Sequence, residues 1–306
     1  MAGNAVGDLR ATLAARRREA RGGATGLSYW QIARRRFVHH RLAMAGGTVA
    51  LILSVVALLS PWISPYAFDR LDLRDRKAAP TLSHPFGTDE LGRDALTRVM
   101  HAGRVSLVVG YATAVNIALI GTVVGAVAGF HGGVIDSVFM RIVDVLLSVP
   151  TIPLYLIMSA LVPGGGVGRI VFIFTLFGWT TVARLVRGQI LSLKSLDYVE
   201  SARAMGASEG RIILRHLVPN TMAPIIVAAT LTVGNAILGE SGLSYLGLGI
   251  QPPIPSWGNM LQRAQEYVWN AWWLAVFPGV FIFITVLAFN FLGDGLRDAL
   301  DPRLKV

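Results

Sequence analysis

The residues whose types and spacing are best suited to act on another molecule lie between positions 195 and 220. Asp197 and Glu200 have the D-x-x-E spacing of a helix-capping box, and they predict a short helix over residues 198–205. Gly206 is placed to end that helix with a positive φ. A short amphipathic helix of this kind can dock in a groove on a partner protein.

A second short helix is predicted directly after this corner. Ser208 is positioned to cap it, and Pro219 is expected to end it before the next apolar run. The first helix carries a small apolar stripe for docking, made of Val199, Ala202 and Met205. One alternative is a surface helix that only stiffens the connection. A DNA-binding helix-turn-helix is disfavoured, because both ends of the unit continue into apolar runs.

Several kinds of chemistry are excluded by what the chain lacks. It has no cysteine, which excludes a disulfide framework, a zinc–thiolate site, a cysteine nucleophile and an iron–sulfur cluster. No lysine follows a glycine, so a phosphate-binding G-x-x-x-x-G-K-[ST] loop is impossible. The six histidines show no H-E-x-x-H spacing. The sequence therefore predicts no catalytic residue, no metal ligand and no bound cofactor, and any energy for transport should come from another subunit.

The elements that must position the 195–220 segment are six apolar runs. Apolar residues make up 53% of the 306-residue chain and charged residues 15%, against about 25% charged in an ordinary soluble domain. Helices are the expected form, because lipid cannot satisfy free backbone amides. None of the runs has an ionisable residue near its centre, which argues against a proton-coupled carrier. The runs are predicted at 42–63, 105–130, 145–162 (interrupted by Pro150 and Pro153), 170–183, 222–239 and 273–292.

The distribution of basic residues predicts the orientation of these runs. The net charge is +10, and residues 1–41 hold nine arginines against two acids. By the positive-inside rule this tail stays in the cytoplasm, and six spans return the C-terminus to the same side. The bases of residues 184–215 then also fall inside. The tail is expected to contact anionic lipid rather than nucleic acid, because no aromatic platform interleaves its arginines.

Three stretches resemble a known family. Glu200-Ser201-Ala202-x-x-x-Gly206, with Pro219 thirteen residues further on, looks like the EAA loop of the membrane subunits of bacterial ABC importers that are fed by a solute-binding protein. Ser201 replaces the middle alanine of that consensus. The ending R-H-x-x-P-N at 215–220 suits the peptide branch. Residues 84–94 (HPFGTDELGRD) and 240–249 (ESGLSYLGLG) also resemble that branch, closest to the C-type permease of dipeptide, oligopeptide and nickel importers.

The resemblance implies an all-α polytopic membrane protein with the type I ABC importer permease fold. A six-helix permease domain would span 42–306 after the basic tail of 1–41, in the bacterial inner membrane with both termini in the cytoplasm. Its implied partners are a homologous second permease, two ATP-binding subunits that use ATP and Mg, and an extracytoplasmic binding protein. The loop 195–220 would couple the pore to the ATPases through Glu200, Ser201, Ala202, Gly206 and Pro219.

The implied solute is a peptide, and several alternatives remain open. The same machinery could carry nickel, glutathione or another small solute. A stand-alone channel or secondary carrier would leave the 195–220 loop without a role, and no nucleophile–base pair supports a membrane enzyme.

The loops on the opposite side, 64–104 and 240–272, are too long for simple hairpins. Their glycines and prolines predict compact, fixed turns. Trp269, Trp272 and Trp273 are expected at the lipid boundary. Trp257 lies among prolines and glycines, and we expect it to help form a docking face for the binding protein.

Overall fold

The computed structural model describes residues 29–301, and within that range it is built from helices, without a β-sheet. This confirms the predicted all-α class. The basic tail up to residue 28 lies outside the described part, so its predicted lipid contact stays a prediction. The helices are α2 (Tyr29–His39), α3 (Arg41–Ile63), α4 (Ala95–His131), α5 (Gly133–Ser148), α6 (Thr151–Leu161), α7 (Val167–Leu193), α8 (Asp197–Ala204), α9 (Glu209–Ile212), α10 (Met222–Tyr245), α11 (Trp257–Ala264) and α12 (Trp273–Leu300).

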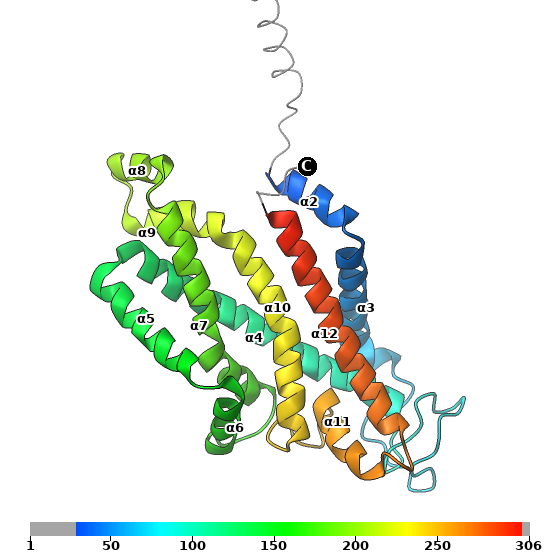
Figure 1. Cartoon of the computed structure of the whole chain (residues 1–306). Helices are drawn as coiled ribbons and strands as arrows, with labels where there is room; N and C mark the ends of the chain where they lie inside the picture. The colour runs from blue at the N-terminus through cyan, green and yellow to red at the C-terminus, as the bar shows by residue number, and fades with distance from the viewer. Residues whose placement is uncertain (1–28, 302–306) are drawn as a thin grey trace, which may run out of the picture.

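Five helices or helical runs within 29–301 are long and apolar enough to cross a membrane, and a sixth span results if α5 and α6 count as one. They form an elongated bundle in Figure 1, with α8 and α9 at one end and α11 and the 64–94 loop at the other. We call these the α8 end and the α11 end. The two described chain ends meet at the α8 end, where the Arg36 guanidinium donates a hydrogen bond of 2.9 Å to the Asp301 carbonyl.

The predicted third span differs most from the structure. It begins at Gly133 rather than Val145, and α5 and α6 meet at an angle of 91° around Pro150. The break follows from proline, which disfavours a helical conformation in the residue before it. Pro153 does not interrupt a helix. It lies in the first turn of α6, where a backbone N–H would have no partner within the helix, so no hydrogen bond is lost.

The prediction that no run has an ionisable residue near its centre was made for runs that are shorter than the helices in the structure. Because α5 starts earlier and α7 extends beyond the predicted run at both ends, these two helices include six further charged residues: Asp136, Arg141, Asp144, Arg169, Arg184 and Arg187. Arg187 forms a two-pronged ion pair with Asp136, with N–O distances of 2.5 and 2.6 Å, and Arg184 pairs with Asp144 at 2.6 Å. These pairs attach the broken span to α7.

A stripe of glycines brings α4 and α7 into close contact. Gly121, Gly125 and Gly129 repeat at four-residue spacing on one face of α4. A Cβ added at Gly121 would lie 2.6 Å from the Cβ of Val182, and one at Gly125 would collide with the Ala183 carbonyl. Small residues allow two helix backbones to approach in lipid, where there is little hydrophobic force between them.

At the α11 end, the 64–94 loop is fixed by buried ion pairs. Arg93 pairs with Asp89 at 2.6 Å and with Glu90 at 3.3 Å, and Arg98 lies 3.5 Å from Asp89. Arg263 of α11 reaches Glu90 at 3.2 Å. Buried charges are tolerated when they are paired. The acidic and basic residues of this loop therefore hold it in one conformation against the end of the bundle.

The predicted tight turns in the two outer loops are confirmed where glycine adopts a positive φ. Gly87, Gly92 and Gly247 have φ values of 72°, 73° and 79°. A side chain is strained in that region, so glycine is the residue that these turns need.

Candidate functional site

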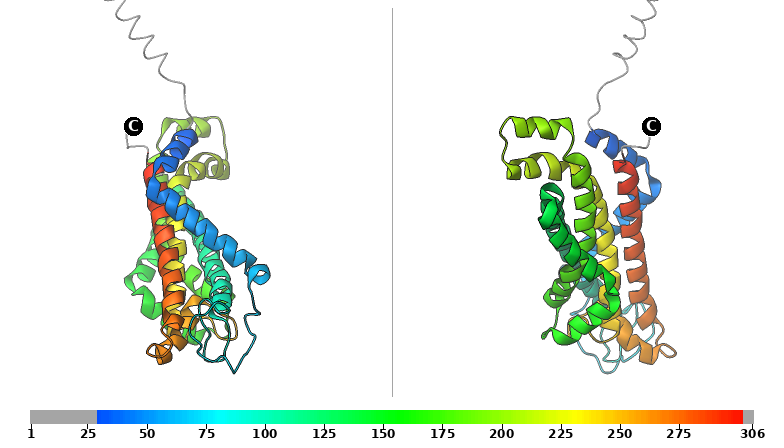
Figure 2. Two further views of the ribbon diagram at one scale, coloured as in Figure 1. Left: turned by 90° about the vertical axis from the view of Figure 1, so that its right-hand side faces the viewer. Right: turned by 60° about the vertical axis from the view of Figure 1, so that its left-hand side comes forward.

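The short helix α8 is held on the α8 end of the bundle by its own apolar face. Val199 and Ala202 are 0% and 3% exposed, and they pack in a cluster with Val186 and Ile190 of α7. Ile212 of α9 joins the same cluster. Figure 2 shows α8 and α9 as a compact unit that projects beyond the spanning helices. The helix α8 is therefore attached to α7 through buried apolar side chains.

The corner after α8 is a complete Schellman motif. Gly206 has φ +79° and donates a hydrogen bond of 2.9 Å to the Arg203 carbonyl, while Ala207 donates one of 3.1 Å to the Ala202 carbonyl. These are the two bonds that define the motif, with glycine at its left-handed position. The predicted corner at Gly206 is confirmed. A Cβ at Gly206 would meet no atom within 4 Å, so only the backbone conformation requires glycine there.

The predicted apolar docking stripe is wrong for two of its three residues. Val199 and Ala202 are used within the chain, and only Met205, 81% exposed, remains free for a partner. The helix needs its apolar face to stay attached to the bundle, so the face left for a partner is more polar. It carries the exposed residues Glu200 and Ser201 beside Met205. Of the predicted site residues on α8, Ala202 is therefore buried against the bundle, while Glu200 and Ser201 are exposed.

Two local predictions in this segment are also wrong. Asp197 is the first residue of α8 rather than its cap, and Leu196 occupies the cap position with no side-chain hydrogen bond. Pro219 does not end a helix. The path continues from α9 through a π turn (Ile213–Leu217) and a 3₁₀ turn (Val218–Thr221) into α10. Proline lies at the start of the 3₁₀ turn, where its missing N–H is tolerated. The part of this segment after the corner is therefore one helical run with α10, Glu209–Tyr245.

A polar recess of about 530 Å³ lies beneath α8. Its lining includes Glu200 and Arg203 of α8 and Lys194 at the end of α7. His131 of α4 lies 3.3 Å from the Glu209 carboxylate, which connects α4 to α9. Within residues 29–301, no ion pair involves Glu200, so its carboxylate is available to a basic group of a partner.

Trp257, the residue predicted to help form a docking face, is buried within this chain, and its docking role stays untested. Its side chain is 1% exposed, and its indole N–H donates a hydrogen bond of 3.0 Å to the Val99 carbonyl of α4. The ring packs against Gly103, where a Cβ would lie 2.9 Å from the ring. Trp257 is a packing residue that fixes α11 on α4. Of the tryptophans expected at the lipid boundary, Trp269 and Trp272 are 93% and 51% exposed, but Trp273 is only 5% exposed.

A buried carboxyl group that the sequence analysis did not single out lies next to Trp257. Glu240 of α10 is 0% exposed and accepts hydrogen bonds from the hydroxyls of Ser106 at 3.0 Å and Ser244 at 2.6 Å. The predicted fifth run stopped one residue earlier, at 239. The location of Glu240 within an apolar stretch that continues as a helix is the sequence feature that could have identified it.

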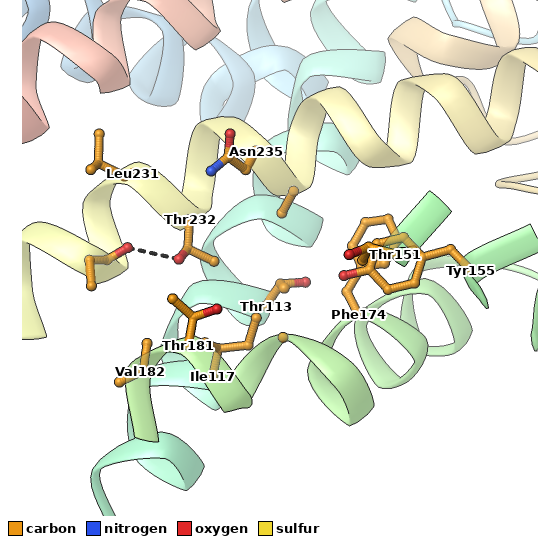
Figure 3. Close-up of a pocket in the computed structure, with 13 residues that line it drawn as sticks. Thr113, Ile117, Thr151, Tyr155, Phe174, Thr181, Val182, Leu231, Thr232 and Asn235 are labelled. Carbon is orange, nitrogen blue, oxygen red and sulfur yellow. Dashed lines mark hydrogen bonds between the residues drawn. The ribbon is translucent and has the colours of Figure 1, made fainter. Parts of the chain in front are cut away.

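An open cavity of about 450 Å³ lies between α4, α6, α7 and α10 (Figure 3). It is lined by threonines, Tyr155, Asn235 and apolar residues. Within residues 29–301, no cluster of three or more histidine, aspartate and glutamate side chains could hold a metal ion. The structure thus has the α8–α9 unit at one end, an uncharged cavity between the spanning helices, and the ion-paired 64–94 loop at the other end.

Comparison with known proteins identifies the family. Residues 121–306 match the model of the binding-protein-dependent transport system inner membrane component, and residues 28–80 match the N-terminal TM domain of oligopeptide transport permease C.

Among the relatives, the dipeptide transport system permease protein DppC of Bacillus subtilis is 47% identical over 91% of this chain and 87% of its own. The oligopeptide transport system permease protein OppC of the same organism is 41% identical over 91% of each chain. The glutathione transport system permease protein GsiD of Pectobacterium atrosepticum is 42% identical over 90% of this chain and 92% of its own. This polytopic membrane protein therefore belongs to the family of binding-protein-dependent transport system inner membrane components.

Proposed function

We propose that this chain forms half of the pathway of a peptide importer and couples that pathway to ATP-binding subunits. The observation that carries the proposal is the attachment of α8: its inner face, Val199 and Ala202, is packed on α7, while Glu200 is exposed. A helix packed in this way transmits motion in either direction without needing to fold or unfold.

The coupling step is a rigid displacement of α8 that reaches two spanning helices. One route runs through the cluster of Val199, Ala202, Val186 and Ile190 into α7. The other runs from α9 through the π and 3₁₀ turns into α10. Because α7 and α10 both line the cavity, moving α8 changes the shape of the cavity between them. Packed elements shift as units rather than deform continuously.

Each end of the bundle is proposed to contact a different kind of partner. Two ATP-binding subunits contact α8 and its counterpart on a homologous second permease, and their closure on ATP supplies the force. A solute-binding protein docks at the α11 end. In this proposal the ATP-binding partners use ATP and Mg, and this subunit contributes the pathway rather than an enzymatic activity.

The orientation in the proposal places the α8 end in the cytoplasm of a bacterial inner membrane. The basic residues Arg203, Arg211 and Arg215 are all exposed at this end, as the positive-inside rule requires. The two described chain ends lie at the same end, so both termini would be cytoplasmic.

The proposed solute is a dipeptide or oligopeptide, as in the names of the first two relatives. Glutathione is a second candidate, because a glutathione permease is 42% identical to this chain.

Reconstitution tests the proposal. The chain is placed in proteoliposomes with its second permease, ATP-binding subunits and binding protein, and uptake of labelled trialanine and of glutathione is measured with and without ATP. We expect ATP-dependent uptake of trialanine by the complex and none by the chain alone. Accumulation of solute by the isolated chain would overturn the coupling, and uptake of glutathione alone would replace the peptide assignment.

A further inference from the structure

The cavity lies half-way along three spanning helices. Thr113 is the central residue of α4, Thr181 adjoins the centre of α7, and Asn235 lies near the centre of α10. In the interior of a membrane-spanning helix, a polar side chain is costly unless it faces protein or a water-filled space. Thr113, Thr181 and Asn235 all line the cavity, which gives their polar groups such a space.

Thr113 has an unsatisfied hydrogen-bonding group in this cavity. It is 1% exposed, and its hydroxyl has no hydrogen-bond partner in the described part of the chain. Threonines in helices commonly bond back to the preceding turn, as Thr230 and Thr232 do at 2.9 and 2.7 Å. Figure 3 shows the Thr113 oxygen directed toward the space bounded by Thr151 and Tyr155. A ligand in the cavity would supply the missing partner.

The lining is uncharged and mostly apolar, with a minority of polar side chains. It has the hydroxyls of four threonines and Tyr155 and the amide of Asn235, and none of its residues is Asp, Glu, Lys, Arg or His. Hydroxyl and amide groups both donate and accept hydrogen bonds, as a peptide group does. A bare metal cation would find no carboxylate or imidazole here, and a charged side chain would lose its hydration without a counter-charge.

One wall of the cavity is aromatic. The rings of Tyr155 and Phe174 lie 4.6 Å apart, centre to centre, and both line the space. Such a wall accommodates an apolar side chain while the threonines and Asn235 bind the main chain.

We propose that this cavity is a solute-selecting site that binds the main-chain amides of an uncharged stretch of peptide in transit, with Thr113 and Asn235 as its hydrogen-bonding residues. The inference rests on the proposed function and adds to it: the solute is selected a second time, after the binding protein, by hydrogen bonding rather than by charge. Peptides with apolar side chains pass more readily than peptides with charged ones.

The first test removes the hydrogen-bonding groups. Thr113→Val and Asn235→Leu are introduced into the complete complex, and trialanine uptake is measured with the binding protein saturated. Each variant should slow uptake by roughly three- to tenfold, the effect of one lost hydrogen bond. Thr113→Ser, which keeps the hydroxyl, should restore the rate. Two matched controls outside the lining, Thr230→Val and Asn116→Leu, should leave the rate unchanged.

The second test changes the selectivity, which a purely structural effect would not do. Asn235→Asp places a carboxylate in the cavity, and we expect it to raise the ratio of trilysine to trialanine uptake several-fold over that of the unmodified complex. If the Thr113→Val complex fails to assemble, this measurement still tests whether the cavity binds the peptide. An unchanged ratio and an unchanged trialanine rate in the Asn235 variants would overturn the inference while leaving the proposed function intact. Failure of the unmodified complex to import any peptide would overturn the proposed function instead.

Discussion

The Ser106 hydroxyl of α4 donates a 3.0 Å hydrogen bond to the buried carboxyl of Glu240 on α10, 134 residues further along the chain. Ser106 in turn accepts a hydrogen bond of 3.4 Å from the backbone N–H of Trp257, the first residue of α11. On the other side, Ser244 donates to Glu240 at 2.6 Å and accepts from the backbone N–H of Ile250 at 3.0 Å. Two hydroxyls thus connect the outer loop to one carboxyl group.

Removing this carboxyl should destabilise the α11 end. Glu240→Ala leaves the hydroxyls of Ser106 and Ser244 without their buried acceptor, and each unsatisfied group costs about 1–3 kcal/mol. We expect a lower thermal unfolding temperature for the detergent-purified complex. Glu266→Ala, at an exposed position on the same loop, is the control and should unfold like the unmodified complex. Equal unfolding temperatures for the two variants would remove the structural role from Glu240.

Trp257 should behave as a packing residue. Trp257→Ala empties the space between α11 and α4, and truncation of a buried aromatic side chain costs about 3–5 kcal/mol. The expected result is a large loss of folded complex, measured by size-exclusion chromatography after mild heating. Trp269→Ala, at a position 93% exposed, should leave the yield unchanged. A Trp257→Ala complex with normal yield but weakened binding-protein docking would instead support a docking role.

The contact of α4 with α7 should depend on the size of one residue. Gly125→Ala introduces a methyl group that collides with the Ala183 carbonyl, so the helices must separate. We expect a lower unfolding temperature and slower peptide uptake. Gly188→Ala on α7 is the matched control, because a Cβ there meets nothing within 4 Å. The close packing has no energetic importance if both variants behave alike.

The sequence was most informative where a structural feature requires a particular type of residue. Apolar runs of sufficient length predicted the spanning helices, and Gly206 predicted a left-handed corner, because few other residues adopt positive φ. The resemblance of residues 200–206 to the EAA loop pointed to the family that the comparisons show, while the coupling role of this segment stays a prediction.

Predictions that depended on tertiary packing were less successful. Val199 and Ala202 form an apolar stripe that fits either a partner's groove or the chain's own bundle, and the pattern alone cannot distinguish the two. Trp257 was placed on the surface because prolines and glycines surround it, although the loop folds back and buries it on α4. The buried Glu240 was left just outside a span, because a window of apolar residues ends at the first charge whether or not the helix does.

The cavity could not be predicted, because its lining comes from four helices that are distant in sequence. Thr113 and Thr232 are ordinary threonines of apolar helices until the fold places them around one space. The glycine stripe of α4 was readable in principle as Gly121-x-x-x-Gly125-x-x-x-Gly129, since such spacing is typical of closely packed membrane helices.

The central claim is that α8 passes the motion of ATP-binding subunits to α7 and α10, and Gly206 tests it most directly. Gly206→Val forces a β-branched side chain into positive φ at a position where a Cβ meets no atom within 4 Å, so its main effect is on the backbone of the corner. Gly210→Val, an equally exposed position without positive φ, is the matched control.

The measurement is the number of peptides imported per ATP hydrolysed by the reconstituted complex. For Gly206→Val, we predict normal membrane insertion but a severalfold lower ratio than for the unmodified complex, with Gly210→Val close to normal. An unchanged ratio for Gly206→Val would contradict transmission through α8.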